Sequence, residues 1–216
     1  MRTKDGSCDH EWNSNVLPWE PRTHITCLRC GKIFKDIEHY VIKLTRDNDF
    51  ITGVLDVGSG MKGPVAEHYW TSIKKIKHGY VCDIWKLKPL PSVWTPLKID
   101  ALTLLEVLGE DSVDVVQAFG FLEHLTKEDG LKFLEIAEKL AIDLVIVSAA
   151  NCLHGWDKNV PGYDPDYKMK VDGNPYHRYN STWHWREFEA LKYESNIEDA
   201  MNDISFNLES IAWKVL

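Results

Sequence analysis

The chain has 216 residues, of which 44% are hydrophobic and 27% are charged, and its formal net charge at pH 7 is −8. This composition is typical of a globular protein with one domain and room for a small appendage. The acidic charge disfavours broad binding to nucleic acid, and no stretch has the apolar length of a signal peptide or a membrane span. We therefore expect a cytoplasmic protein with no membrane partner.

Two close pairs of metal-binding side chains frame the first 36 residues. They are Cys8, His10, Cys27 and Cys30. So short a segment cannot bury enough surface to fold alone, and four such ligands suit tetrahedral Zn²⁺. The Cys-x-x-Cys-Gly-Lys turn also resembles a zinc knuckle. We therefore expect a module with a structural zinc ion at residues 1–36, with His24 as an alternative to His10. The competing interpretation is that Cys27 and Cys30 are a redox pair or ordinary thiols.

An apolar strand breaks into glycines at residues 54–60. Gly58 and Gly60 lack the side chains that would keep a ligand away from the backbone, and a helix is expected to follow at residues 64–76. A strand, a glycine turn and a helix in this order predict a site for a nucleotide-like ligand. Together with Gly63, the glycines also fit the dinucleotide fingerprint, which leaves a nicotinamide-dependent oxidoreductase as an alternative.

Further strands are expected at residues 80–83, 112–119 and 143–149. The first of them ends at Asp83, whose carboxylate can accept hydrogen bonds from both hydroxyls of a ribose. The last two flank a helix that is expected to begin after the N-cap Thr126. Strands that alternate with helices predict an α/β sheet with its ligands at the carboxyl ends of the strands.

Three segments together resemble the class I S-adenosylmethionine-dependent methyltransferases. Residues 54–60 match the hydrophobic-Leu-Asp-hydrophobic-Gly-x-Gly motif. Residues 97–102 place an acid and then a small residue at the third strand. Residues 114–125 contain Asp-x-Val followed by Leu-Glu-His-Leu. The resemblance, which extends from residue 54 to about residue 192, implies a Rossmann-like sheet that is mostly parallel with an antiparallel C-terminal strand.

This resemblance divides the chain and implies a methyl donor. Residues 37–50 become a connecting segment with a short amphipathic element at residues 38–44, and residues 51–216 become the methyltransferase domain. Asp100 would accept from the exocyclic amine of adenine, and the backbone at Ala101 would hold a ring nitrogen. The residues expected to contact S-adenosyl-L-methionine are Asp56, Gly58, Ser59, Gly60, Asp83, Ile84, Asp100, Ala101, Gln117 and Phe119.

Residues 151–180 form a long stretch without clear periodicity. A loop of this length in a compact domain is usually functional, and its aromatic residues argue against disorder. We expect a lid over the crevice. Residues 173–183 are similar to a segment of small bacterial and viral members of the same methyltransferase group. This resemblance implies that Ser181 or Thr182 caps a helix over residues 183–192 of this chain. The expected substrate contacts are His154, Tyr176, Arg178 and Trp183.

Two histidines are the candidates for a catalytic base, which is needed only if the acceptor must lose a proton. They are His124, which follows the fourth strand, and His177. The sequence therefore predicts a methyltransferase that acts on a small metabolite, a sugar or a protein side chain. A zinc-bearing binding protein without catalysis is the second alternative.

Overall fold

The computed structural model describes residues 25–26, 33–34, 37–60, 63–150, 173–195 and 209–216. The chain forms two compact units, Met1–Asp49 and Phe50–Leu216. Six of the candidate residues lie outside the described residues, namely Cys8, His10, His24, Cys27, Cys30 and His154. None of the described helices is long and apolar enough to cross a membrane.

In the first unit, the described residues form a short strand pair and one helix. β1 (Ile25–Thr26) pairs antiparallel with β2 (Ile33–Phe34). α1 (Ile37–Thr45) confirms the amphipathic element that was expected at residues 38–44. The hydroxyl of Thr45 donates to the carbonyl of Val41 at 2.7 Å within the last turn of this helix.

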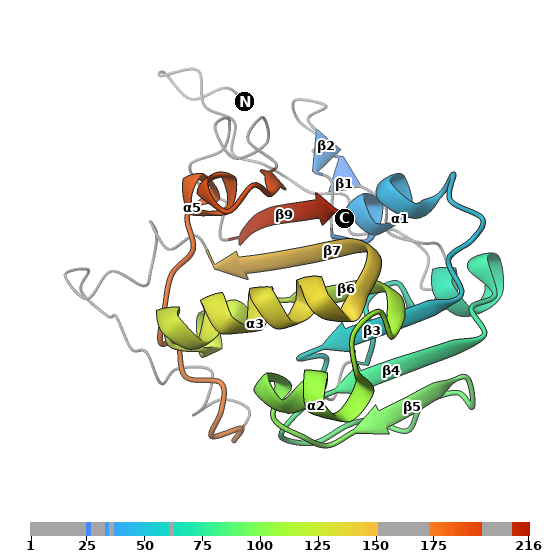
Figure 1. Ribbon diagram of the computed structural model, residues 1–216, viewed down its shortest axis with the longest axis horizontal. Helices are drawn as coiled ribbons and strands as arrows, with labels where there is room; N and C mark the ends of the chain where they lie inside the picture. Colours follow the sequence, from blue (N-terminus) through green and yellow to red (C-terminus); the bar gives the residue numbers. More distant parts are fainter. Residues whose placement is uncertain (1–24, 27–32, 35–36, 61–62, 151–172, 196–208) are drawn as a thin grey trace. The chain divides into compact units, whose positions relative to one another are not determined.

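The second unit is built on one sheet, in which the described residues form seven strands in the order β5-β4-β3-β6-β7-β9-β8 (Figure 1). β9 runs antiparallel between β7 and β8, while the strands from β5 to β7 are parallel. This arrangement confirms the expected mostly parallel sheet with an antiparallel C-terminal strand. The strands are β3 (Gly53–Val57), β4 (His78–Cys82), β5 (Trp94–Leu97), β6 (Val113–Phe119), β7 (Ala141–Ala150), β8 (Glu194–Ser195) and β9 (Glu209–Val215).

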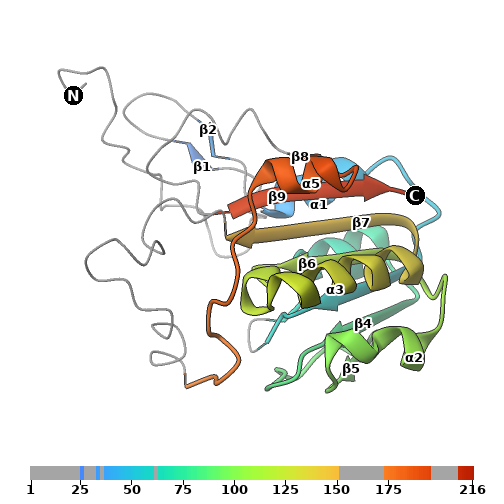
Figure 2. The same ribbon diagram turned by 60° about the vertical axis from the view of Figure 1, so that its left-hand side comes forward.

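The central strands are continuous apolar runs because helices cover them. Every residue of β3 is buried, which is typical of a parallel strand inside an α/β sheet. α2 (Leu104–Leu108) and α3 (Lys127–Leu140) lie on the same face of the sheet (Figures 1 and 2). α5 (Trp185–Ala190) packs near the antiparallel edge, against β8 and β9.

The expected N-cap of α3 is confirmed. The hydroxyl of Thr126 accepts from the backbone N–H of Asp129 at 3.1 Å. Leu131 is 39% exposed on this helix, whereas Phe133 is fully buried. Gly130 faces the ring of Trp183, which lies too close to leave room for a side chain there.

The helix expected at residues 64–76 is replaced in part by a π-helix, η1 (Tyr69–Lys74). Two adjacent aromatic residues, Tyr69 and Trp70, are both buried, and the wider turn of a π-helix brings both to the interior. Ile73, in the same helix, is 59% exposed. Lys75 then ends the helix in a left-handed conformation with φ 56°.

The last helix begins later than expected. His184, rather than Ser181 or Thr182, is the N-cap of α5, and its ring nitrogen Nδ1 accepts from the N–H of Arg186 at 3.2 Å. The carboxylate of Glu187 accepts from the N–H of His184 at 2.7 Å and completes a capping box. The start is delayed because Trp183 enters the core, where it is fully buried.

The contact of Gly130 with Trp183 yields a stability prediction. Gly130→Ala places a methyl group against the buried indole ring, so we expect the free energy of unfolding to fall by about 1–3 kcal/mol. The same substitution at an uncrowded helical glycine would instead stabilise the protein by roughly 1 kcal/mol. Urea unfolding measures the sign. Glu135→Ala, at an exposed position of the same helix, is the control and should change stability by less than about 0.5 kcal/mol.

Candidate active site

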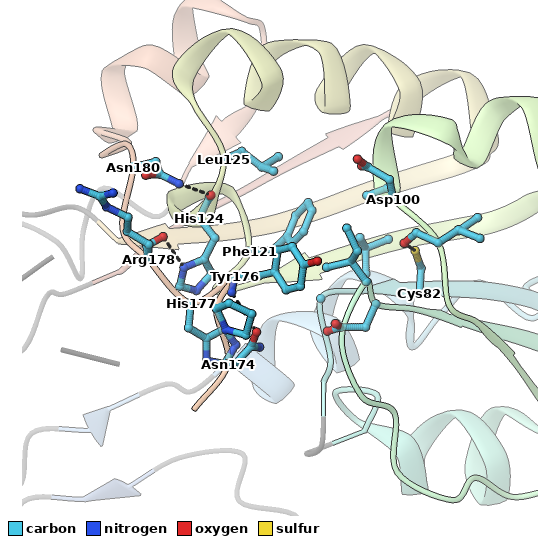
Figure 3. A pocket seen from close by; sticks show the side chains of 17 residues that line it. Cys82, Asp100, Phe121, His124, Leu125, Asn174, Tyr176, His177, Arg178 and Asn180 are labelled. Atoms are coloured by element: carbon cyan, nitrogen blue, oxygen red, sulfur yellow. Dashed lines mark hydrogen bonds between the residues drawn. The ribbon is translucent and has the colours of Figure 1, made fainter. Parts of the chain in front are cut away.

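A cavity of about 330 Å³ lies at the carboxyl ends of the parallel strands (Figure 3). In an α/β sheet the polar residues that follow neighbouring strands meet at this edge, which is where such folds bind ligands. Five of the residues expected to bind the methyl donor line the cavity. They are Gly58, Asp83, Ile84, Asp100 and Ala101.

The carboxylate of Asp83 is fixed beside the glycine turn. One of its oxygens accepts from the N–H of Gly60 at 2.9 Å, and the other accepts from the N–H of Trp85 at 2.7 Å. A carboxylate oxygen has a further lone pair beyond one such bond. Asp83 can therefore hold the turn and still accept hydrogen bonds from two hydroxyl groups of a ligand.

Asp100 and Ile84 form the next part of the wall. Asp100 caps the short 3₁₀ helix η2 (Ala101–Thr103), since its Oδ1 accepts from the N–H of Leu102 at 2.9 Å. Ile84 is 39% exposed although it is apolar. An exposed aliphatic side chain beside an acid and a small residue suits a flat, partly polar ring.

Asp56 lies beneath the glycine turn and does not line the cavity. Its Oδ2 accepts from the N–H of Val65 at 2.9 Å and from the amide of Gln117 at 2.5 Å. Gln117 in turn accepts from the indole of Trp70 at 3.1 Å and donates to the carbonyl of Val65 at 2.9 Å. Burial raises the pKa of Asp56 to about 7. Asp56 and Gln117 therefore support the turn from below.

The other expected donor contacts are placed close to the cavity without lining it. Ser59 and Gly60 belong to the turn itself, and Phe119 ends β6. Gly58 has φ 80°, and a side chain there would lie 2.7 Å from the ring of Phe121. A glycine is thus required at this position by the backbone conformation and by its aromatic neighbour.

The thiol of Cys82 also lines the cavity, at the end of β4. Burial raises its pKa to about 12, because the thiolate would lose its hydration in this setting. The sulfur donates to the carbonyl of Ile99 at 3.6 Å. Burial therefore favours the neutral thiol at this position of the wall.

The two expected catalytic histidines come together on the other wall of the cavity. His124 ends the 3₁₀ helix η3 (Leu122–His124), which follows β6. Its ring stacks on that of His177 with 5.0 Å between the centroids and 20° between the planes. The Nδ1 atom of His124 lies 3.1 Å from the carbonyl oxygen of Arg178 (Figure 3).

Two of the expected substrate contacts line the cavity and a third does not. Arg178 is exposed at the wall, and Tyr176 is 47% exposed with its ring 6.1 Å from that of Trp85. Trp183 is buried in the core, where its Nε1 donates to the hydroxyl of Ser181 at 2.9 Å. Trp183 therefore packs in the core and is not in a position to contact a substrate in this cavity.

Sequence reasoning missed Asn174, Phe121 and Asn180, which also line the cavity. Asn174 is 5% exposed, and its Oδ1 accepts from the N–H of Tyr176 at 3.0 Å. An Asn that bonds the backbone two residues further on forms an Asx turn, so Asn-Pro-Tyr was a signal for this one. Phe121 and Asn180 carry no comparable local signal.

Comparison with known proteins gives the fold of this unit. No family model matches the chain, and no curated protein does. Among solved structures, a phosphoethanolamine N-methyltransferase 2 of Haemonchus contortus, bound to phosphomonomethylethanolamine and S-adenosylhomocysteine, superposes with a TM-score of 0.53 at 14% identity. An O-methyltransferase family protein of Burkholderia thailandensis superposes with a TM-score of 0.51 at 12% identity.

These matches cover 83% and 82% of this chain but only 53% and 57% of the two solved chains, so the chain spans about half of their length. A smaller protein of Listeria monocytogenes, assigned as an S-adenosylmethionine-dependent methyltransferase, has a TM-score of 0.51 at 14% identity. There the match covers 82% of this chain and 97% of the other. The fold is therefore that of the S-adenosylmethionine-dependent methyltransferases.

The buried carboxyl of Asp56 yields a prediction for the pH dependence of stability. A pKa of about 7 in the folded protein, against an ordinary value of 3.8, means that the folded state takes up the proton more readily than the unfolded state. The stability from this group is complete below about pH 4 and is lost as the pH rises towards 7. Asp56→Asn removes the titration.

We therefore expect the wild type to lose stability relative to Asp56→Asn on going from pH 5 to pH 8, by on the order of 3 kcal/mol. Urea unfolding of both proteins across this range gives the difference. A difference that stays constant with pH would contradict the burial of an ionisable Asp56. Glu110→Gln, at an exposed acid, is the control.

Proposed function

We propose that this protein is a methyltransferase that uses S-adenosyl-L-methionine as donor and acts on a small metabolite, a sugar or a protein side chain. The observation that carries the proposal is a single cavity lined by two acids, each of which follows one of two neighbouring strands. The sheet that holds this cavity has the antiparallel strand β9 inserted between β7 and β8. These acids are Asp83 after β4 and Asp100 after β5. Their spacing along the sheet edge suits the ribose and the adenine of one nucleoside.

The wall residues fit the donor, which supplies a methyl group on a positively charged sulfur. Asp83 would accept from the ribose hydroxyls, since both of its oxygens are already oriented by backbone bonds. Asp100 would accept from the exocyclic amine of adenine, and Ile84 would cover one face of the ring. The turn at Gly58 would lie against the amino-acid end of the donor.

The same contacts disfavour a dinucleotide. A pyrophosphate binds to free N–H groups in the turn and at the start of the following helix. Here Asp83 occupies the N–H of Gly60, and Asp56 occupies the N–H of Val65. The carboxylate of Asp83 next to the turn would also repel phosphate oxygens. These contacts favour the methyltransferase over the oxidoreductase.

His124 is the side chain that we assign as catalytic base, with its stacked neighbour His177 as the alternative. Both line the cavity beside the donor residues. In the reaction the acceptor atom forms a bond to the methyl carbon, the carbon–sulfur bond breaks, and its electron pair stays on sulfur. An acceptor that starts as a hydroxyl or N–H group gives its proton to the imidazole. Tyr176 and Arg178 would contact the acceptor from the same wall.

We further propose that residues 1–36 bind a structural zinc ion through Cys8, His10, Cys27 and Cys30. The strands β1 and β2, which directly flank residues 27–32 in the sequence, pair antiparallel with Ile25 opposite Phe34. The two-residue gap between Cys27 and Cys30 is a spacing that structural zinc sites use. Among the described residues there is no cluster of three or more metal-binding side chains.

Calorimetry with purified protein tests the donor assignment. We expect S-adenosylmethionine and S-adenosylhomocysteine to bind and NAD not to bind. Asp83→Asn should weaken the binding of S-adenosylhomocysteine roughly ten- to hundredfold, because it removes charge-assisted bonds to the ribose. Glu110→Gln removes a carboxylate at an exposed position and should not change the affinity. Binding of NAD without either donor compound would support the oxidoreductase instead.

Metal analysis tests the zinc module. Protein purified with zinc in the medium is expected to contain stoichiometric zinc and to lose it in Cys27→Ser/Cys30→Ser. Cys82→Ser is the matched control, since it removes a thiol whose position in the wall of the cavity is known. Wild-type protein without zinc, or a double variant that keeps it, would contradict the module.

A further inference from the structure

Residues 174–183, which we call the strap, are attached to the backbone of η3. Three consecutive carbonyl groups of this helix accept bonds from the strap. The hydroxyl of Ser181 donates to Leu122 at 3.1 Å, the N–H of Asn180 donates to Glu123 at 2.8 Å, and the side-chain amide of Asn180 donates to His124 at 2.7 Å. The strap is therefore a fixed wall at this end of the cavity.

Asn180 makes two of these bonds, one from its backbone and one from its side chain. They fix the chain only two residues after Arg178, and so set where the carbonyl of Arg178 lies relative to the ring of His124. Figure 3 shows both contacts of His124, to Asn180 and to Arg178. The rings of His177 and Tyr179, each with its centroid 5.0 Å from that of His124, add packing from the strap.

The contact between His124 and Arg178 determines which ring nitrogen carries hydrogen. A backbone carbonyl only accepts, so the Nδ1 atom at 3.1 Å must be the N–H donor. In a neutral imidazole the other nitrogen, Nε2, then holds the lone pair. Without a fixed carbonyl, both neutral tautomers of the ring would be accessible, and the lone pair would lie on Nε2 in one and on Nδ1 in the other.

We propose that Asn180 is a positioning residue that keeps neutral His124 in the Nδ1–H tautomer, through the carbonyl of Arg178. This inference rests on the proposed function only in the role of His124. Nε2 is the nitrogen that accepts the proton of the methyl acceptor, while Nδ1–H stays bonded to the strap. Asn180 itself does not exchange a proton with any group.

The test is a nitrogen NMR measurement of the histidine tautomers in ¹⁵N-histidine-labelled protein, with His124→Gln used to assign the signals. At a pH where the imidazole of His124 is neutral, the wild type should show this residue in the Nδ1–H form. Asn180→Asp replaces the amide donor by an oxygen that faces the carbonyl of His124. We expect the ratio of Nδ1–H to Nε2–H forms to fall roughly two- to tenfold, the equivalent of one hydrogen bond.

Two further variants separate positioning from loss of structure. Asn180→Gln keeps an amide donor and should keep the Nδ1–H form. Ser181→Ala loosens the strap at Leu122 without touching His124, and should leave the tautomer ratio unchanged even if stability falls. Thermal unfolding of each variant shows whether it is folded.

The outcomes are distinct. An unchanged ratio in folded Asn180→Asp, or an Nε2–H form in the wild type, would overturn the positioning role. Loss of the Nδ1–H form in Asn180→Asp alone supports it. The tautomer is measured in protein without a methyl donor or a methyl acceptor. Failure to bind S-adenosylmethionine in calorimetry would therefore overturn the proposed function without affecting the tautomer result.

Discussion

The buried carboxylate of Asp56 connects the parts of the protein that have to meet at the cavity. It is 2% exposed, and it accepts bonds from the backbone at Val65 and from Gln117 on the neighbouring strand. Because Gln117 also holds the indole of Trp70, one charge-bearing group ties β3, β6, the turn and η1 together. A buried acid is costly unless its bonds are made, so this group tolerates few alternative conformations. The turn is therefore held in place before a ligand arrives.

Much of the sheet could be predicted because parallel strands covered on both faces are continuous apolar runs. Asp83 was expected at the ligand for a related reason, since ligands bind where such strands end, whereas Asp100 was expected from the resemblance of residues 97–102 to the methyltransferases. The pairing of Asp56 with Gln117 could not be derived in this way. These residues are partners in the register of β3 with β6, and register depends on how two distant segments align. Both were expected at the ligand and are found beneath the turn.

The helices were less predictable where large side chains compete for the interior. Spacing alone favoured an ordinary helix near Trp70, but burial of two adjacent aromatic residues selects a π-helix. Likewise, the buried indole of Trp183 packs against Gly130 of α3, and α5 begins only after this residue. The contacts of Asn180 with η3 join residues 56 positions apart, so no local pattern could indicate them.

The position of β9 has a consequence for the order in which the sheet can assemble. β8 precedes β9 in the chain, yet its pairing partner is β9, and β9 pairs in turn with β7. Within the described part of the chain, this edge of β7 and the strand β8 therefore have no other partner during synthesis until residues 209–215 have emerged. An unpaired edge next to a long apolar strand is prone to association with other chains. Among the described strands, β9 is thus the one that closes this edge of β7.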